Sequence, residues 1–192
     1  MRFDKGHKER TRGHILEMAS RRFRQDGVAA SGIATIMADS GLTNGAFYAH
    51  FESKEALVRE SLQNTLAQQC DRLEAMKEGS GGIEAVIRDY LDPAHVSEPH
   101  AGCPSAALLP EIGRQPRATR DGYEAGLLRY VALLASLLPQ PESPATARRA
   151  MAIFASMVGT LQLARAVGEA SLCDDILAGG VETALGLARR EA

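Results

Sequence analysis

Residues 31–51 predict two short helices joined by a glycine turn. Ile33, Ile36 and Met37 recur at the i, i+3, i+4 spacing that gives a helix one apolar face. Gly41 ends this helix, since glycine adopts the left-handed conformation at no steric cost. A second short helix follows the turn. This arrangement is a helix-turn-helix.

The second short helix, over residues 44–51, has a face that suits a DNA major groove. Phe47 and Phe51 are four residues apart and face inward. Thr43 stands at the N-cap, where a hydroxyl can accept a free backbone N–H. The residues left outside are small, polar or amphipathic, which suits insertion into the groove: Asn44, Gly45, Ala46, Tyr48 and His50.

A family resemblance runs through this segment. Residues 41–51, GLTNGAFYAHF, and 53–57, SKEAL, resemble the signature of the TetR family of bacterial transcriptional regulators. Upstream, the family's alanine, aromatic residue, helix-ending glycine and phosphate-binding hydroxyl are matched by Ala19, Phe23, Gly27 and Ser31. Met37 departs from the pattern, because members more often have alanine there. The resemblance covers about the first third of the chain and implies DNA binding.

We therefore expect this segment to bind double-stranded DNA at a palindromic operator, because paired helix-turn-helix units read paired half-sites. Tyr48 and Lys54 are expected on phosphates, and Asn44, Ala46 and His50 at or near base edges. The complete set of expected DNA contacts is Ser31, Thr43, Asn44, Gly45, Ala46, Tyr48, His50 and Lys54.

The charge of the chain is distributed unevenly. Residues 1–54 hold nine Lys and Arg against six Asp and Glu, a balance of +3, whereas the remainder carries −5. A basic end on an acidic body is the electrostatic pattern of a protein that touches DNA with one end. The basic residues before the helix-turn-helix are further candidates for phosphate or minor-groove contacts: Lys5, Lys8, Arg10 and Arg12.

Helical patterns account for the whole chain, so the expected fold class is all-α. We expect a three-helix DNA-binding domain over residues 1–52 and a larger helical domain for effector binding and dimerisation over 53–192. The predicted helices are 7–26, the two of the helix-turn-helix, 53–77, 83–91, one opening at Pro104 and closed by Gly113, 117–138, 145–169 and 174–190, with 92–102 as a loop.

The last two helices are expected to form a homodimer interface. Small and apolar groups fall on one face of the first, and small residues allow helices to approach closely: Ala152, Ala155, Ser156, Gly159, Leu163 and Val167. Two such helices from each subunit make a four-helix bundle. The alternative is that this face belongs to a core within one chain. TetR-like proteins dimerise through the corresponding helices, which favours the dimer.

The resemblance also implies a pocket for a small-molecule effector, unidentified here, within residues 54–138. Tyr90 and Tyr123 are the better candidates to line it, because a buried phenol needs a hydrogen-bond partner and can orient a ligand. The apolar candidates include Leu66, Ile87, Leu109 and Leu127, although residues of this kind more often belong to an ordinary core than to a ligand site.

Cys103 suggests an alternative signal. It immediately precedes the helix opening at Pro104, where aligned peptide dipoles can stabilise a thiolate. The alternative function is a regulator that senses oxidants or electrophiles through Cys103, which should then alkylate faster than Cys70 or Cys173. The other interpretation is that Cys103 packs beside the helix start without special reactivity.

Other classes of protein are disfavoured. His95, Glu98, His100 and Cys103 match no zinc spacing, so no metal is expected. We expect no enzyme activity and no cofactor, because the chain has no nucleophile elbow and no P-loop. No apolar run reaches the length of a membrane span, no secretory signal is recognisable, and three widely spaced cysteines fit a reducing compartment. We expect a cytoplasmic protein without membrane contact.

Overall fold

The computed structural model describes residues 5–79 and 81–190, which fold entirely into helices and connecting turns. The first elements are α1 (Lys5–Asp26), α2 (Ile33–Asp39) and the 3₁₀ helix η1 (Asn44–Ala49). We call these three elements the head. The elements that follow, from α3 to α9, are called the body. The all-α prediction is confirmed.

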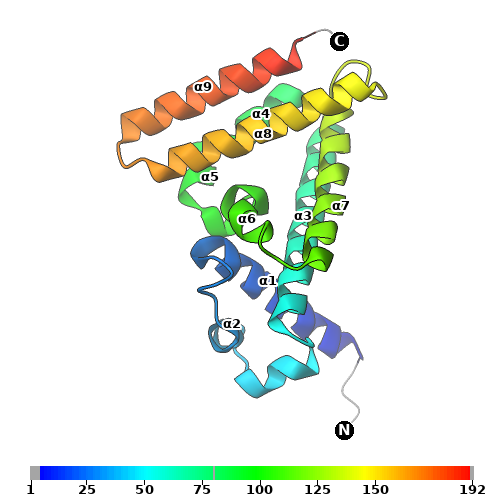
Figure 1. The fold of residues 1–192 in the computed structure, drawn as a ribbon, viewed down its shortest axis with the longest axis vertical. Helices are drawn as coiled ribbons and strands as arrows, with labels where there is room; N and C mark the ends of the chain where they lie inside the picture. Colours follow the sequence, from blue (N-terminus) through cyan, green and yellow to red (C-terminus); the bar gives the residue numbers. More distant parts are fainter. Residues whose placement is uncertain (1–4, 80, 191–192) are drawn as a thin grey trace.

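The body consists of α3 (Lys54–Glu78), α4 (Ile83–Tyr90), α5 (Pro93–Ser97), η2 (Pro99–Ala101), α6 (Pro104–Ile112), α7 (Arg117–Ala135), α8 (Pro144–Ala166) and α9 (Ala170–Ala188). Helices α3 and α7 run side by side from the head to the far end, where α8 and α9 pack together across the top (Figure 1). Helix α6 lies between the head and α8, in contact with both α1 and α8.

The buried apolar residues of the described part form two clusters. The lower cluster joins the head to the start of α3 and takes Leu108 and Ile112 from α6 and Tyr123 from α7. The upper cluster unites the second half of α3 with α4, α7, α8 and α9. Leu127 packs against both clusters. The body is therefore packed against the head through α6 and α7 as well as through the continuous helix α3.

Several predicted boundaries need correction. The second helix of the helix-turn-helix is a 3₁₀ helix that ends at Ala49. The expected loop 92–102 contains α5, which Asp92 starts by accepting the Ala94 N–H at 2.8 Å, with Pro93 at the first position. Helix α7 ends at Ala135, three residues early, and α9 begins at Ala170, four residues early.

No helix among the described residues is long and apolar enough to cross a membrane. Ser143 and Ser53 act as the N-caps that their positions predicted, accepting the Ala145 N–H and the Ala56 N–H respectively. Thr43 occupies the N-cap position of η1, but its side chain forms no capping hydrogen bond within the described residues.

Candidate DNA-binding surface and ligand cavity

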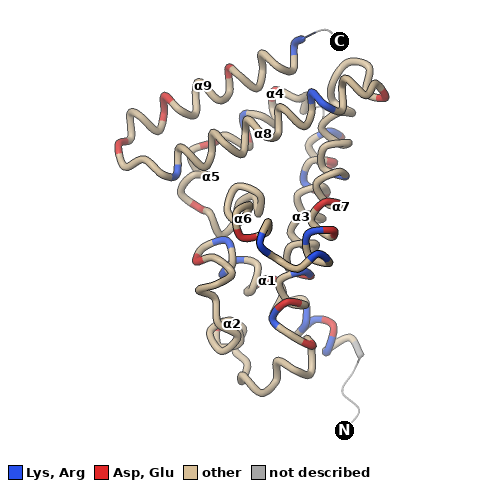
Figure 2. The backbone as a smooth tube through the Cα atoms, in the orientation of Figure 1, with Lys and Arg blue, Asp and Glu red and all other residues tan. Residues whose placement is uncertain are grey.

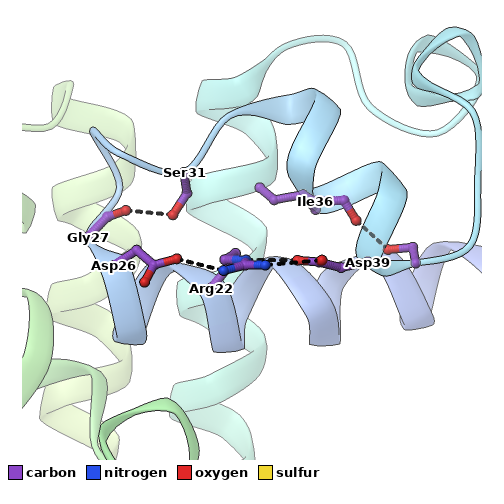
Figure 3. A network of polar contacts seen from close by, with 7 residues as sticks. Arg22, Asp26, Gly27, Ser31, Ile36 and Asp39 are labelled. Atoms are coloured by element: carbon purple, nitrogen blue, oxygen red, sulfur yellow. Dashed lines mark hydrogen bonds and ion pairs between the residues drawn. The ribbon is translucent and has the colours of Figure 1, made fainter.

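The first two helices are locked together by one arginine. Arg22 on α1 donates from Nε and Nη2 to the two carboxylate oxygens of Asp39 on α2, at 2.8 and 3.1 Å, and from Nη1 to Asp26 at 2.9 Å (Figure 3). This paired geometry suits a planar guanidinium. The hydrogen bonds from Arg22 lower the pKa of Asp39, so the link persists well below neutral pH.

The turn between α2 and η1 depends on Gly41. Its φ of 70° lies in the left-handed region, which a side chain makes costly. The Leu42 N–H donates to the Met37 carbonyl at 2.9 Å. The Ser40 hydroxyl donates to the Ile36 carbonyl at 2.8 Å (Figure 3). These bonds close the end of α2. They fix the angle at which η1 leaves it.

The 3₁₀ helix η1 is anchored on one side and open on the other. Phe47 is fully buried and stacks on Phe51 with ring centroids 5.7 Å apart. Tyr48 stands edge-on to Phe47 and is 72% exposed. The remaining predicted contacts of this segment form a continuous edge: Thr43, Asn44 and Gly45 are exposed, whereas Ala46 and His50 are half-buried.

The backbone of His50 is held from α1, within the head. Arg12 donates from Nε to the His50 carbonyl at 3.3 Å, pairs with Glu60 on α3 and lies 4.6 Å over the Phe51 ring. Burial, followed by the charges of Lys8 and Arg12, lowers the pKa of His50. Arg12 is thus engaged in packing the head on α3.

The other predicted basic contacts differ in their surroundings. Lys8 and Arg10 are exposed on α1, and the side chain of Lys5 lies outside the described residues. Figure 2 shows basic residues on α1 near the amino-terminal end of the molecule, next to acidic ones. Basic charge is therefore present near η1 but is not a single continuous stripe.

Ser31 and Lys54 meet at the turn that follows α1. Gly27 ends α1 with φ 85°, and its carbonyl accepts the Ser31 hydroxyl at 2.6 Å. The Lys54 ammonium donates to the Val28 carbonyl at 2.7 Å. Ser31 is buried and Lys54 half-buried. Both side chains are thus held by hydrogen bonds to backbone carbonyls of the turn that follows α1.

A cavity of about 460 Å³ lies in the body between α3, α4, α7 and the segment from α5 to Cys103. Its wall combines charged, polar and apolar groups, of which the most distinctive are Arg24, Gln69, Tyr90, His95, Cys103 and Tyr130. This volume is within the range of small-molecule sites. Arg24 brings α1, and thus the head, into the wall.

Tyr90 has the least satisfied polar group of this wall. Its hydroxyl is buried and has no hydrogen-bond partner among the described residues. Burial raises the pKa of Tyr90 well above its ordinary value, and the nearby Cys103 thiol adds to the shift. The phenol is therefore protonated at neutral pH. Burial likewise raises the pKa of Tyr130.

Arg24 connects the cavity wall to the head. Its Nε donates to the His100 carbonyl at 2.8 Å, and its Nη1 donates to Ser20 and Thr65 at 3.0 and 3.1 Å. Burial lowers the pKa of Arg24 to about 10, which still leaves it charged at neutral pH. Sequence reasoning missed this residue, because nothing in its spacing separates it from Arg21 and Arg22.

The predicted effector contacts are distributed over several environments. Tyr90 and Cys103 line the cavity. Tyr123 shares a 2.8 Å hydrogen bond with Ser105 and packs in the lower cluster with Leu66. The others do not line the cavity: Ile87 is buried in the upper cluster, Leu127 packs between the clusters, and Leu109 is 37% exposed at the surface. Leu109 therefore lies outside the lining of this cavity, and its role as an effector contact stays a prediction.

The three cysteines are free thiols. Cys103 is 0% exposed, directed toward Gln69, whereas Cys173 is partly accessible. Burial raises the pKa of Cys70. This burial does not favour the expectation that Cys103 is the most readily alkylated thiol, which stays a prediction. No group of three potential metal ligands occurs within residues 5–79 and 81–190.

Comparison with known proteins agrees with this fold. The family described as "Bacterial regulatory proteins, tetR family" matches residues 15–61. The HTH-type transcriptional regulator AcrR of Shigella flexneri is 41% identical over 105 residues, which are 54% of this chain and 48% of AcrR. TtgR of Pseudomonas putida, also an HTH-type transcriptional regulator, is 36% identical over 40% of this chain and 36% of its own. The chain thus aligns with about half or less of these relatives.

Solved structures match over nearly the whole chain. The reduced form of Escherichia coli NemR has a TM-score of 0.76 at 22% identity and covers 95% of this chain and 99% of its own. A TetR-family regulator of Agrobacterium tumefaciens has a TM-score of 0.76 at 19% identity, covering 92% and 98%. These likenesses concern the fold. Residues 15–61 thus match the TetR family of bacterial regulatory proteins, and the described residues have the fold of solved TetR-family regulators.

Proposed function

We propose that this chain is a transcriptional regulator, a repressor that binds a palindromic DNA operator as a homodimer and releases it when a small molecule binds. The observation that carries the proposal is the exposed side of η1 around Tyr48, beside the buried Phe47 that anchors η1 in the lower cluster. The family and the HTH-type regulators among its relatives support the same function.

The DNA contacts we propose are those expected from the sequence. Asn44, Ala46 and His50 face base edges, and Tyr48 and Lys54 bind phosphates. Ser31, Thr43 and Gly45 complete the set. The exposure of Tyr48 and of residues 43–45 supports this assignment. We also propose the division into a DNA-binding domain, 1–52, and a domain for effector binding and dimerisation, 53–192.

The homodimer is proposed to form through α8 and α9. Ala152 and Ala155 are exposed on α8, Gly159 is partly exposed, and Leu163 on the same face is 62% exposed. A large apolar side chain among small ones is suited to close helix packing. Two copies of the pair α8 and α9 would then form a four-helix bundle.

The effector is proposed to occupy the cavity beside Tyr90. A cavity of about 460 Å³ fits a molecule of drug-like size, and the protonated phenol can donate to an oxygen or nitrogen of that molecule. A sensor acting through Cys103 is less well supported, because its thiol is buried.

Selection of bound duplexes from a random pool tests the function. We expect recovery of a palindrome and, by analytical ultracentrifugation, an even number of chains per duplex. Failure to enrich any sequence, with binding no tighter than to a scrambled duplex, would contradict the proposal.

A further inference from the structure

The turn of Gly27, Val28 and Ala29, here called the clasp turn, is held from the body by one carboxylate. Oε2 of Glu111 accepts the backbone N–H of Val28 at 2.9 Å and that of Ala29 at 3.1 Å. Glu111 lies near the end of α6, more than eighty residues along the chain. Hydrogen bonds from two amides to one carboxylate are charge-assisted and stronger than neutral ones.

The opposite side of the clasp turn holds two of the proposed phosphate ligands. The Gly27 carbonyl accepts from the Ser31 hydroxyl, and the Val28 carbonyl accepts from the Lys54 ammonium. An ammonium has three donors, so this bond leaves two of them for a phosphate. Glu111 on one side and Ser31 and Lys54 on the other are thus joined through two consecutive peptide groups.

Gly27 is required by this arrangement for two reasons. Its φ of 85° is in the left-handed region. A Cβ at this position would also lie 2.7 Å from Oε1 of Glu111. The glycine therefore gives the turn its conformation and makes room for the carboxylate.

The other end of α6 reaches the cavity. Cys103, the residue immediately before α6, lines the cavity and donates its N–H to His95. Leu108 and Ile112 of the same helix are buried in the lower cluster. A helix of nine residues spans about 13 Å, so α6 is a short rigid connection between the cavity wall and the clasp turn.

We propose that Glu111 is a positioning residue for DNA binding. Through the clasp turn it holds Lys54 and Ser31 where they meet phosphates, and through α6 it transmits displacement of the cavity wall to them. This inference rests on the proposed function. It assigns to a residue of the body an effect on DNA affinity that requires no contact between Glu111 and DNA.

Four single variants and one double variant test this role with the operator recovered by selection. Glu111→Ala removes the acceptor, and we expect about tenfold weaker binding. The number of ions released on binding should fall by about one per subunit, as for the loss of one phosphate contact in each subunit. Glu111→Gln retains an acceptor oxygen without the charge and should restore most of the affinity. Glu124→Ala, an exposed carboxylate on α7, is the matched control and should bind as the wild type does.

The double variant Lys54→Ala/Glu111→Ala separates positioning from a general loss of stability. If Glu111 acts through Lys54, the double variant should bind within about twofold of Lys54→Ala alone, because interacting sites are not additive. The proposal would be overturned if the fold-loss in affinity of the double variant equalled the product of the losses of the two single variants. It would also be overturned if Glu111→Ala bound DNA as tightly as the wild type. Tighter binding by both Glu111→Ala and Glu111→Gln would also overturn it, since that result indicates simple repulsion between Glu111 and DNA.

Hydrogen exchange in the protein without DNA gives a second measurement. The amides of Val28 and Ala29 should exchange faster in Glu111→Ala, and amides in the middle of α1 should keep their wild-type rates. If the exchange rates of the Val28 and Ala29 amides were unchanged in Glu111→Ala, the carboxylate would not hold the clasp turn. A wild-type protein that selects no duplex would instead contradict the proposed function itself.

Discussion

The imidazole of His95 bridges Tyr90 and Cys103 in the wall of the cavity. Its Nδ1–H donates to the Tyr90 carbonyl at 2.7 Å, and its Nε2 accepts the Cys103 N–H at 2.9 Å. Since one nitrogen donates and the other accepts, the ring is neutral and has its proton on Nδ1. Protonation of Nε2 would place its N–H against the backbone N–H of Cys103, so this hydrogen bond would be lost. The bridge therefore holds the start of α6 only in the neutral form.

Acid should weaken the fold through His95. Burial lowers its pKa, the Tyr90 carbonyl and Asp89 oppose this effect, and Arg165 and Arg72 add to it. The unfolded chain then takes up a proton from about pH 6.5 downward, before the folded chain does, so the free energy of unfolding falls as the pH falls from about 6.5 toward the lowered value.

Thermal unfolding of the wild type and of His95→Gln between pH 5 and 8 measures this effect. Glutamine can donate and accept in the same places but does not titrate, so the difference between the two curves should shrink as the pH falls. His14→Gln on the exposed side of α1 is the control and should follow the wild type. A constant difference between wild type and His95→Gln would show that His95 does not titrate in this range.

Tyr90→Phe should leave the stability of the free protein unchanged or raised. The Tyr90 hydroxyl has no partner within the described residues, so its removal breaks no hydrogen bond. Tyr123→Phe is the matched comparison: it loses the 2.8 Å bond to Ser105 and should cost about 1 kcal/mol. Chemical denaturation measures both. If both variants lost the same free energy of unfolding, the Tyr90 hydroxyl would form a hydrogen bond in solution.

The sequence predicted a helix correctly wherever an apolar periodicity defines one face and a single residue ends the helix. Gly27 and Gly41 end α1 and α2 as predicted, both at positive φ. The short elements were harder. In α5, five residues give too few turns for a pattern, and its start depends on the Asp92 cap. In η1, Phe47 packs in the lower cluster, but its spacing to Phe51 does not distinguish a 3₁₀ helix from an α-helix.

The candidate site was predictable only where function depends on local sequence. The predicted DNA contacts on η1 lie close together in the sequence, so a sequence motif identifies them. The cavity is assembled from Arg24, Gln69, Tyr90 and Tyr130, which lie on four different helices. Whether Tyr130 or Leu127 faces it depends on the rotation of α7 against α3. Tertiary packing sets that rotation, so of the effector contacts expected from the sequence only Tyr90 and Cys103 line this cavity.

Leu163→Glu should convert the dimer to a monomer. A charge at this position of α8 would be buried against the partner in the proposed four-helix bundle, which is costly without a compensating group. Leu128→Glu on α7 is the matched control, because Leu128 is 54% exposed but lies outside α8 and α9. Sedimentation velocity measures both. A dimeric Leu163→Glu protein would place the interface elsewhere.

Replacement of Lys54 and of Asn44 should weaken DNA binding in different ways. Lys54→Ala removes the proposed phosphate contact of each subunit, so it should weaken binding to the operator and to a scrambled duplex alike. It should also lower the number of ions released on binding by about one per subunit. Asn44→Ala should instead change the preferred base pair at one position of each half-site, with a loss of about 1–3 kcal/mol in discrimination. Repeating the selection with each variant distinguishes the two outcomes, since only Asn44→Ala should alter the recovered sequence. A changed consensus for Lys54→Ala would reverse the roles assigned to these two residues.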